Sequence, residues 1–145
     1  MAGKILIVDD EEAYCEVLAM ILQTEGYQVR QCTKSKEVID ILKTENFDLI
    51  ISDLIMPEMD GVALLKAVKK FRPNIYFIML TAYGTIENAV QAMKQGAFTY
   101  VIKGSDPEGL IKEIGNISKL SQIQNRENED SAERGGEFMM RTNSP

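Results

Sequence analysis

The chain has 145 residues, 45% of them hydrophobic, and its 22 acidic and 16 basic residues give a net charge of -6. This length suits about one domain with a real core, and the acidic balance argues against direct nucleic-acid binding, because phosphate contacts need clustered Lys and Arg. Histidine is absent, which excludes histidine catalysis, histidine metal ligands and a histidine phosphorelay within the chain.

The first half of the chain alternates short apolar runs with helical patterns. Residues 4–8 and 28–32 predict strands, and residues 49–52 predict a third. The first and third runs are apolar without alternation, which is typical of strands covered on both faces. Residues 11–24 and 35–44 predict helices between them. The apolar face expected for the first helix consists of Tyr14, Val17, Leu18, Ile21 and Leu22.

The second half repeats the alternation. Residues 61–70 and 85–95 predict helices, and residues 75–80 and 99–102 predict strands. A fifth helix should begin at "DPE" (106–108), which supplies an N-cap, a first-turn proline and an acid at the positive end of the dipole. The residues that we expect the helix at 85–95 to bury are Ile86, Ala89, Val90 and Met93.

This order predicts a single α/β domain over residues 1–121, with a doubly wound five-stranded parallel sheet and five helices on its two faces. From Gln122 the sequence is polar and charged, so residues 122–145 are expected to be a linker or disordered tail. An apolar stripe reaching towards Ile123 leaves open a linker helix or dimer contact. No run approaches the roughly 18 apolar residues of a membrane span, and Cys15 and Cys32 lack metal-like spacing. We therefore expect a cytoplasmic protein without membrane contact.

Polar side chains stand at the carboxyl ends of four predicted strands: Asp9-Asp10, Asp53, Thr81 and Lys103. Ligands of open α/β sheets bind at that edge, where the strand order reverses. If the first and third strands are neighbours, three carboxylates converge and need a hard cation such as Mg²⁺. With an ammonium and a hydroxyl beside them, these groups suit a phosphoryl group at a carboxylate nucleophile.

Each residue alone has a plainer explanation. Asp10 would cap the first helix, and Asp53 would be an ordinary loop acid. Thr81 and Lys103 alone indicate nothing, and Tyr100 would be half-buried packing. Only the joint placement at four strand ends favours a phosphoacceptor site.

Four blocks, "ILIVDDE", "DLIISDLIMPEMDG", "IMLTAYG" and "YVIK", resemble in this order the receiver domain of two-component response regulators. The resemblance covers about residues 3–121, and "TAYGTIENAVQAMKQGA" is most similar to the nitrogen-regulator (sigma-54 activator) subfamily. It implies a flavodoxin-like strand order 2-1-3-4-5. It also implies a switch in transcription control, not an enzyme with a separate substrate, that is phosphorylated by a partner sensor histidine kinase.

The resemblance assigns the acidic residues to metal and phosphate. Asp53 would be the phosphoacceptor, and Asp10 would bind Mg²⁺ directly together with Asp53 and the backbone carbonyl of Ile55. Asp9 would act on the metal mostly through water. A homodimer would form across the face made by the fourth helix, the fifth strand and the fifth helix.

The same resemblance places Thr81 and Lys103 on the phosphoryl oxygens and makes Tyr100 the aromatic whose rotamer reports phosphorylation. The family usually has a proline after this lysine, joined by a cis bond, whereas this chain has Gly104. Either the bond is trans and the loop is rebuilt, or a cis glycine is strained. The permissive dihedral angles of glycine favour the rebuilt loop.

Two rival functions stay open. A magnesium-dependent phosphohydrolase of the haloacid-dehalogenase type usually has an acid two residues after its nucleophile, where this chain has Ile55. A pseudo-receiver that has lost phosphorylation is disfavoured because the acidic set is complete. The signalling switch is therefore the first expectation.

Overall fold

The computed structural model describes residues 3–82 and 86–135, with side chains as far as Ser121. Strands and helices alternate, as expected. The strands are β1 (Lys4–Val8), β2 (Gln28–Cys32), β3 (Leu49–Asp53), β4 (Tyr76–Thr81) and β5 (Thr99–Ile102). The helices are α1 (Glu12–Thr24), α2 (Val38–Thr44) after a short 3-10 turn (Ser35–Glu37), α3 (Gly61–Phe71), α4 (Ile86–Lys94) and α5 (Pro107–Gly135).

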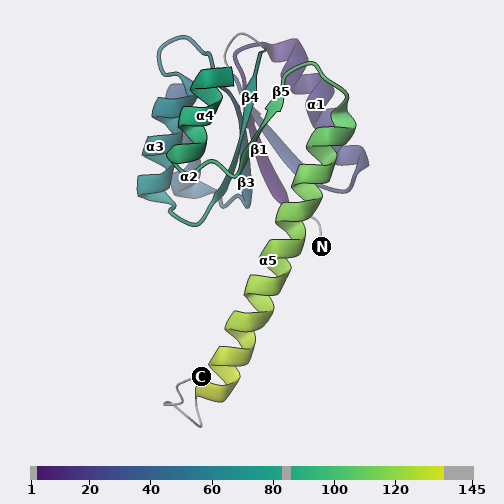
Figure 1. Cartoon of the computed structure of the whole chain (residues 1–145), viewed down its shortest axis with the longest axis vertical. Helices are drawn as coiled ribbons and strands as arrows, with labels where there is room; N and C mark the ends of the chain where they lie inside the picture. The colour runs from purple at the N-terminus through teal and green to yellow at the C-terminus, as the bar shows by residue number, and fades with distance from the viewer. Residues whose placement is uncertain (1–2, 83–85, 136–145) are drawn as a thin grey trace.

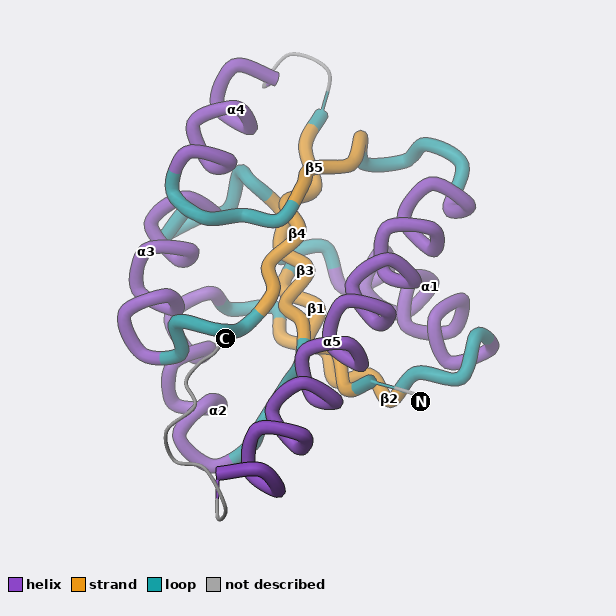
Figure 2. The backbone as a smooth tube through the Cα atoms, turned by 60° about the horizontal axis from the view of Figure 1, so that its bottom comes forward, coloured by secondary structure: helices purple, strands orange, loops and turns teal. Residues whose placement is uncertain are grey.

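The strands form one parallel sheet in the order β2-β1-β3-β4-β5. The sheet is the middle of three layers, with α1 and α5 on one face (Figure 1) and α2, α3 and α4 on the other (Figure 2). β1 and β3 are neighbours, and Val8 lies opposite Ser52. The predicted doubly wound fold and its flavodoxin-like order are confirmed.

The central strands are apolar throughout because both faces of the sheet are covered. In β1, Ile5 and Ile7 pack with α1 and α5, whereas Leu6 and Val8 pack with the helices of the opposite face. All four are at most 1% exposed. Successive side chains of a strand point to opposite faces of the sheet. A strand that is apolar at every position therefore contributes side chains to the hydrophobic cores on both faces. Each such side chain contributes about 1.5–3 kcal/mol on burial.

Helix α1 is rotated relative to the expected burial. Val17, predicted to be in the core, is 57% exposed. Cys15 and Ala19 are buried instead, together with Leu18 and Leu22. The apolar stripe of α1 is broad, and its small side chains face the sheet, where they let the helix pack closely.

Helix α4 differs from the expectation for the same reason. Ala89 and Ala92 face the sheet and are 0% exposed. Ile86, Val90 and Met93, which were expected to be buried, are 36%, 42% and 37% exposed. The larger apolar side chains of α4 therefore form an outward-facing apolar strip.

Helix α5 extends well beyond the edge of the sheet (Figure 1). Ile114 and Ile117 are buried, whereas Leu120 is 40% exposed, so packing on the sheet ends near Ile117, as predicted. The helix continues to Gly135, so residues 122–135 are helical, and the linker or tail expected for residues 122–145 stays a prediction. This agrees with the linker-helix alternative, while the domain boundary near residue 121 stays a prediction. Within the described residues, no helix has both the length and the apolar composition needed to cross a membrane.

The loop after β3 is tied back to the sheet by Gly61. Its backbone N–H donates to the Leu54 carbonyl at 2.8 Å. A Cβ at residue 61 would lie 2.6 Å from the Asp53 carbonyl oxygen and 2.7 Å from the Met79 sulfur. Residue 61 must therefore be glycine, because its backbone lies directly against the backbone of Asp53 and Leu54. This contact fixes the backbone that carries Asp53.

We expect Gly61→Ala to lower the free energy of unfolding by about 1–3 kcal/mol, the usual cost of overpacking, because the added methyl group has no space. Urea unfolding measures the change. Gly115→Ala in α5 is the matched control, since a Cβ there meets nothing within 4 Å. It should raise stability by about 0.5–1 kcal/mol through helix propensity alone. Equal effects of the two substitutions would contradict the steric argument.

Candidate functional site

The predicted site residues lie together at the carboxyl edge of the sheet. Asp9 directly follows β1, Asp53 and Thr81 are the last residues of β3 and β4, and Lys103 directly follows β5. The Lys103 N–H donates to the Thr81 carbonyl at 2.8 Å, so the ladder continues past the strand end. The site spans the boundary between β1 and β3, where the strand order reverses.

Asp9, Asp10 and Asp53 form an acidic cluster in which each offers a carboxylate oxygen within 4.8 Å of the others. Asp9 is 0% exposed and Asp53 is 8% exposed, whereas Asp10 is open to solvent. Helix α1 has no side-chain cap, so Asp10 does not cap it. The Glu11 N–H donates to Asp9 Oδ1 at 2.9 Å and orients that carboxylate.

The Lys103 ammonium is the cation of this cluster. Its Nζ lies 2.8 Å from Asp9 Oδ2 and 3.1 Å from Asp53 Oδ2, and it also pairs with the Glu11 carboxylate. The Lys103 side chain is only 17% exposed, so water screens these pairs incompletely. One ammonium cannot balance all the carboxylates around it, and the cluster keeps an excess of negative charge.

Burial and neighbouring charges shift the protonation of both partners. Burial raises the pKa of the Asp9 carboxyl above its usual range, against the attraction of Lys103, and the Asp53 carboxylate adds to the rise. Burial alone would lower the pKa of the Lys103 ammonium, but its contacts with Asp9, Glu11 and Asp53 raise that pKa overall. Lys103 therefore stays charged, and the Asp9 charge is held at a cost in stability.

Two residues that the sequence did not single out complete the surroundings of Lys103. The Glu11 carboxylate pairs with the ammonium, and Lys103 Nζ lies 4.8 Å from the centroid of the Tyr14 ring. Both residues come from the start of α1, directly behind the Asp9-Asp10 pair. Their position next to the Asp9-Asp10 pair could have indicated that they belong to the site. An acid near the start of a helix is, however, usually explained by its interaction with the helix dipole.

Three further predicted residues lie near the cluster, but their contacts do not test their predicted roles. Thr81 is 0% exposed, and its hydroxyl donates to the Ala82 carbonyl at 3.1 Å. Tyr100 is half-buried against the core beneath α2, α3 and α4, so its switch role stays a prediction beside plain packing. The Ile55 N–H approaches Asp53 Oδ1 at 3.4 Å, and the Ile55 carbonyl stays a predicted metal ligand.

The loop after Lys103 is built without a cis bond. The peptide bond to Gly104 is trans, as are the others in the described residues. Gly104 has a φ of 83°, in the left-handed region that glycine enters without steric cost. Of the two alternatives expected from the sequence, the structure has the trans peptide bond with a rebuilt loop, and not the strained cis glycine.

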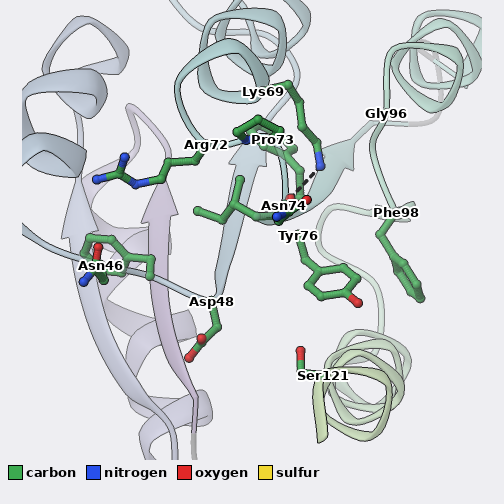
Figure 3. A pocket seen from close by; sticks show the side chains of 13 residues that line it. Asn46, Asp48, Lys69, Arg72, Pro73, Asn74, Tyr76, Gly96, Phe98 and Ser121 are labelled. Atoms are coloured by element: carbon green, nitrogen blue, oxygen red, sulfur yellow. Dashed lines mark hydrogen bonds between the residues drawn. The ribbon is translucent and has the colours of Figure 1, made fainter. Parts of the chain in front are cut away.

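A separate cavity of about 710 Å³ lies at the opposite, amino-terminal edge of the sheet (Figure 3). Asp48, Tyr76 and Phe98 are among the residues that line it. The Lys69 ammonium at its rim donates to the Ile75 carbonyl at 2.5 Å. None of the predicted site residues lines this cavity, so it is not part of the candidate site.

A family profile described as the response regulator receiver domain matches residues 5–115. The chain belongs to this family. The transcriptional regulatory protein ZraR of Escherichia coli (strain K12) is 39% identical to it over 106 residues, which are 73% of this chain and 24% of ZraR. GlrR of the same organism is 39% identical over 119 residues, 82% of this chain and 27% of GlrR. The receiver domain described here thus spans about a quarter of the length of these curated relatives.

Solved structures agree with the family. A response regulator receiver domain from Clostridium thermocellum matches with a TM-score of 0.79 and 31% identity, over 86% of this chain and 99% of that one. NtrX from Brucella abortus matches with a TM-score of 0.82 and 28% identity, over 89% of this chain and 29% of NtrX. The predicted receiver family, with its similarity to the nitrogen-regulator group of sigma-54 activators, is confirmed.

Receiver domains bind Mg²⁺ at an acidic pocket, and the cluster of Asp9, Asp10 and Asp53 suits such an ion. Its donors are carboxylate oxygens, the ligands that Mg²⁺ prefers. Asp9 Oδ2 is buried and, although it lies 2.8 Å from Lys103 Nζ, it accepts no well-directed hydrogen bond from the described residues. A further positive charge would relieve both this oxygen and the excess of carboxylates.

We expect Asp9→Asn to raise the free energy of unfolding at neutral pH without divalent cations. Because the folded-state pKa of Asp9 is raised, its contribution is fully present below the unfolded value of 3.8 and is lost as pH rises through the folded pKa. The advantage of Asp9→Asn should therefore shrink towards pH 3.8. Urea unfolding across this pH range measures it.

The control is Asp40→Asn, which removes a carboxylate that is 80% exposed. Its effect should stay within about 0.5 kcal/mol at every pH. A variant Asp9→Asn that is less stable than the parent at neutral pH would show that the Asp9 charge is net stabilising and would refute the expectation.

Proposed function

We propose that this receiver domain is a phosphorylation-dependent signalling switch of the cytoplasm. It accepts a phosphoryl group from a partner sensor histidine kinase onto Asp53, with Mg²⁺, and changes conformation to control an output domain or partner. The observation that carries the proposal is the setting of Asp53. Its carboxylate lies 3.1 Å from Lys103 Nζ and within 4.8 Å of oxygens of Asp9 and Asp10.

The proposed transfer uses groups that the chain supplies. A carboxylate oxygen of Asp53 attacks the phosphorus of a phosphohistidine, the P–N bond breaks, and its electron pair returns to the imidazole. The donor must be a partner, because this chain contains no histidine. The Lys103 ammonium and the Thr81 hydroxyl would stabilise charge on the phosphoryl oxygens.

Asp10, Asp53 and the Ile55 carbonyl would hold Mg²⁺, with Asp9 acting through water. When bound, the ion supplies charge neutralisation between the carboxylates and the incoming phosphoryl oxygens. The buried Asp9 Oδ2 and the surplus of negative charge support this role.

Phosphorylation requires Lys103 to exchange one of its partners. The ammonium has three N–H donors and already faces the carboxylates of Asp9, Glu11 and Asp53. Glu11 is the partner that leaves at least cost, because its side chain is 64% exposed and water replaces the lost contact. Glu11 is thus proposed to release Lys103 when the phosphoryl group arrives.

The rival phosphohydrolase lacks a general acid. The position two residues after Asp53 holds Ile55, an apolar residue that is 57% exposed. An aspartyl phosphate formed here would have no side chain at that position to protonate a leaving alcohol. This favours a signalling switch, which changes conformation when phosphorylated, over a phosphohydrolase, which releases a product.

The relatives ZraR and GlrR are transcriptional regulatory proteins of which this chain matches about a quarter. We therefore propose that the receiver acts on transcription through an output segment or partner outside residues 1–121. The net charge of -6 makes direct DNA contact by this chain unfavourable.

We expect acetyl phosphate with Mg²⁺ to add one phosphoryl group to the chain, because Asp53 is the carboxylate beside the lysine and the metal site. Intact-mass spectrometry measures the addition. Asp53→Asn should abolish it, while Asp60→Asn, in the same loop, should leave it unchanged because the amide can still cap α3.

Full labelling of Asp53→Asn at another native residue would overturn the assignment. Failure of the parent chain to label, with Mg²⁺ present and the fold intact, would favour the pseudo-receiver. Rapid turnover of small phosphomonoesters would favour the phosphohydrolase.

The conformational output is proposed to run from Thr81 to Tyr100 and onto α4. A phosphoryl group at Asp53 would draw the Thr81 hydroxyl away from the Ala82 carbonyl, which it now contacts at 3.1 Å. Tyr100 sits on β5 next to β4, paired with Met79, and would adjust to the vacated space. A local charge event thereby biases a two-state element.

We expect beryllofluoride to strengthen self-association through the face of α4, β5 and α5, because Val90 and Met93 leave apolar area exposed on α4. Sedimentation velocity measures the dimer fraction. Met93→Ser should weaken the dimer, and Met20→Ser should not, because Met20 is 66% exposed on α1, a helix outside the proposed face. A monomer in both states at high concentration would leave docking of a different partner.

A further inference from the structure

The surroundings of Lys103 include an aromatic face as well as carboxylates. The Tyr14 ring, from the first turn of α1, has its centroid 4.8 Å from Lys103 Nζ. This is within the distance at which a ring attracts a cation. Tyr14 is half-buried and also packs against the core of α1 and α5, so its ring is held in place.

The backbone after Lys103 is held by local hydrogen bonds, because the Ser105 N–H and the Ser105 hydroxyl donate to the Ile102 carbonyl at 3.2 and 2.7 Å. Gly104 has no side chain that could brace the lysine, and a Cβ there would meet nothing within 4 Å. The φ of 83° there is open to glycine and costly for other residues. These hydrogen bonds hold the backbone, whereas the direction of the Lys103 side chain depends on the groups around its ammonium.

Burial raises the pKa of the Tyr14 phenol, and the neighbouring Lys103 ammonium opposes that rise. The phenol therefore stays neutral, and Tyr14 presents an uncharged aromatic face to the tip of Lys103.

We propose that Tyr14 is a positioning residue for Lys103: its ring holds the ammonium against the carboxylates of Asp9 and Asp53. The placement itself does not depend on phosphorylation. Its consequence for the rate of phosphoryl transfer rests on the proposed function.

Ordinary core packing predicts a different outcome from a cation contact. A packing role is carried by apolar volume, which leucine largely replaces. A cation contact needs the aromatic face, which phenylalanine keeps and leucine lacks. The pair Tyr14→Phe and Tyr14→Leu therefore separates the two roles, with Phe as the matched control.

The first experiment is a double-mutant cycle on the unfolding equilibrium of the full chain without divalent cations, combining Tyr14→Leu with Lys103→Met. We expect a coupling of about two- to thirtyfold in the unfolding constant, the range of a cation–π contact. The cycle that uses Tyr14→Phe should show no coupling beyond about twofold. Coupling below twofold in the leucine cycle, or equal coupling in both cycles, would overturn the proposal.

The second experiment measures the rate of Asp53 phosphorylation by acetyl phosphate with Mg²⁺. Tyr14→Phe should match the parent, and Tyr14→Leu should be slower by about two- to thirtyfold. If Tyr14→Leu is phosphorylated at the same rate as the parent chain, the proposal is overturned. If the parent chain is not phosphorylated, the proposed function fails, and the unfolding cycle still decides the role of Tyr14.

If Tyr14→Leu does not fold, nuclear Overhauser contacts in the parent chain replace it. The Lys103 Hε protons should contact the Tyr14 ring protons and be shifted upfield by the ring. A parent spectrum with neither signal would overturn the proposal.

Discussion

The ion pairs of Lys103 with Asp9 and Asp53 are the interaction on which the site depends. A parallel sheet brings the carboxyl ends of β1, β3 and β5 to one edge, so like charges must be accommodated there. The single ammonium holds two buried carboxylates at 2.8 and 3.1 Å and leaves the rest of the negative charge unbalanced. The same imbalance that weakens the fold is what would attract a cation and a phosphoryl group.

The alternation of strands and helices was predictable from the apolar pattern, and the strand order was predictable only through the family resemblance. The run Leu49-Ile50-Ile51 marks a strand buried on both faces, because alternate residues serve two different cores. The burial of α1 and α4 was predicted less well. In α4 the alanines pack on the sheet and the larger Val90 and Met93 turn outward, whereas in α1 Cys15 and Ala19 are buried beside Leu18 and Leu22, and Val17 is exposed. A hydrophobic pattern alone does not contain this preference.

The site was predictable wherever it depends on strand ends alone. Asp9, Asp53 and Lys103 meet because the strand order is 2-1-3-4-5, and no side-chain detail is needed to infer it. Glu11 and Tyr14 were missed because their contacts depend on how α1 is rotated and on where the lysine points.

Helix α5 has the geometry of a lever. It begins four residues after Lys103, its last buried residue among the described side chains is Ile117, and it runs on to Gly135. The stretch from Ile117 to Gly135 is roughly 27 Å long at the rise of an α-helix. A tilt of about 5° at its base therefore moves its far end by roughly 2 Å. A change at its base that is too small to disturb the packed core around Asp53 would therefore become a displacement of roughly 2 Å at the far end of the helix.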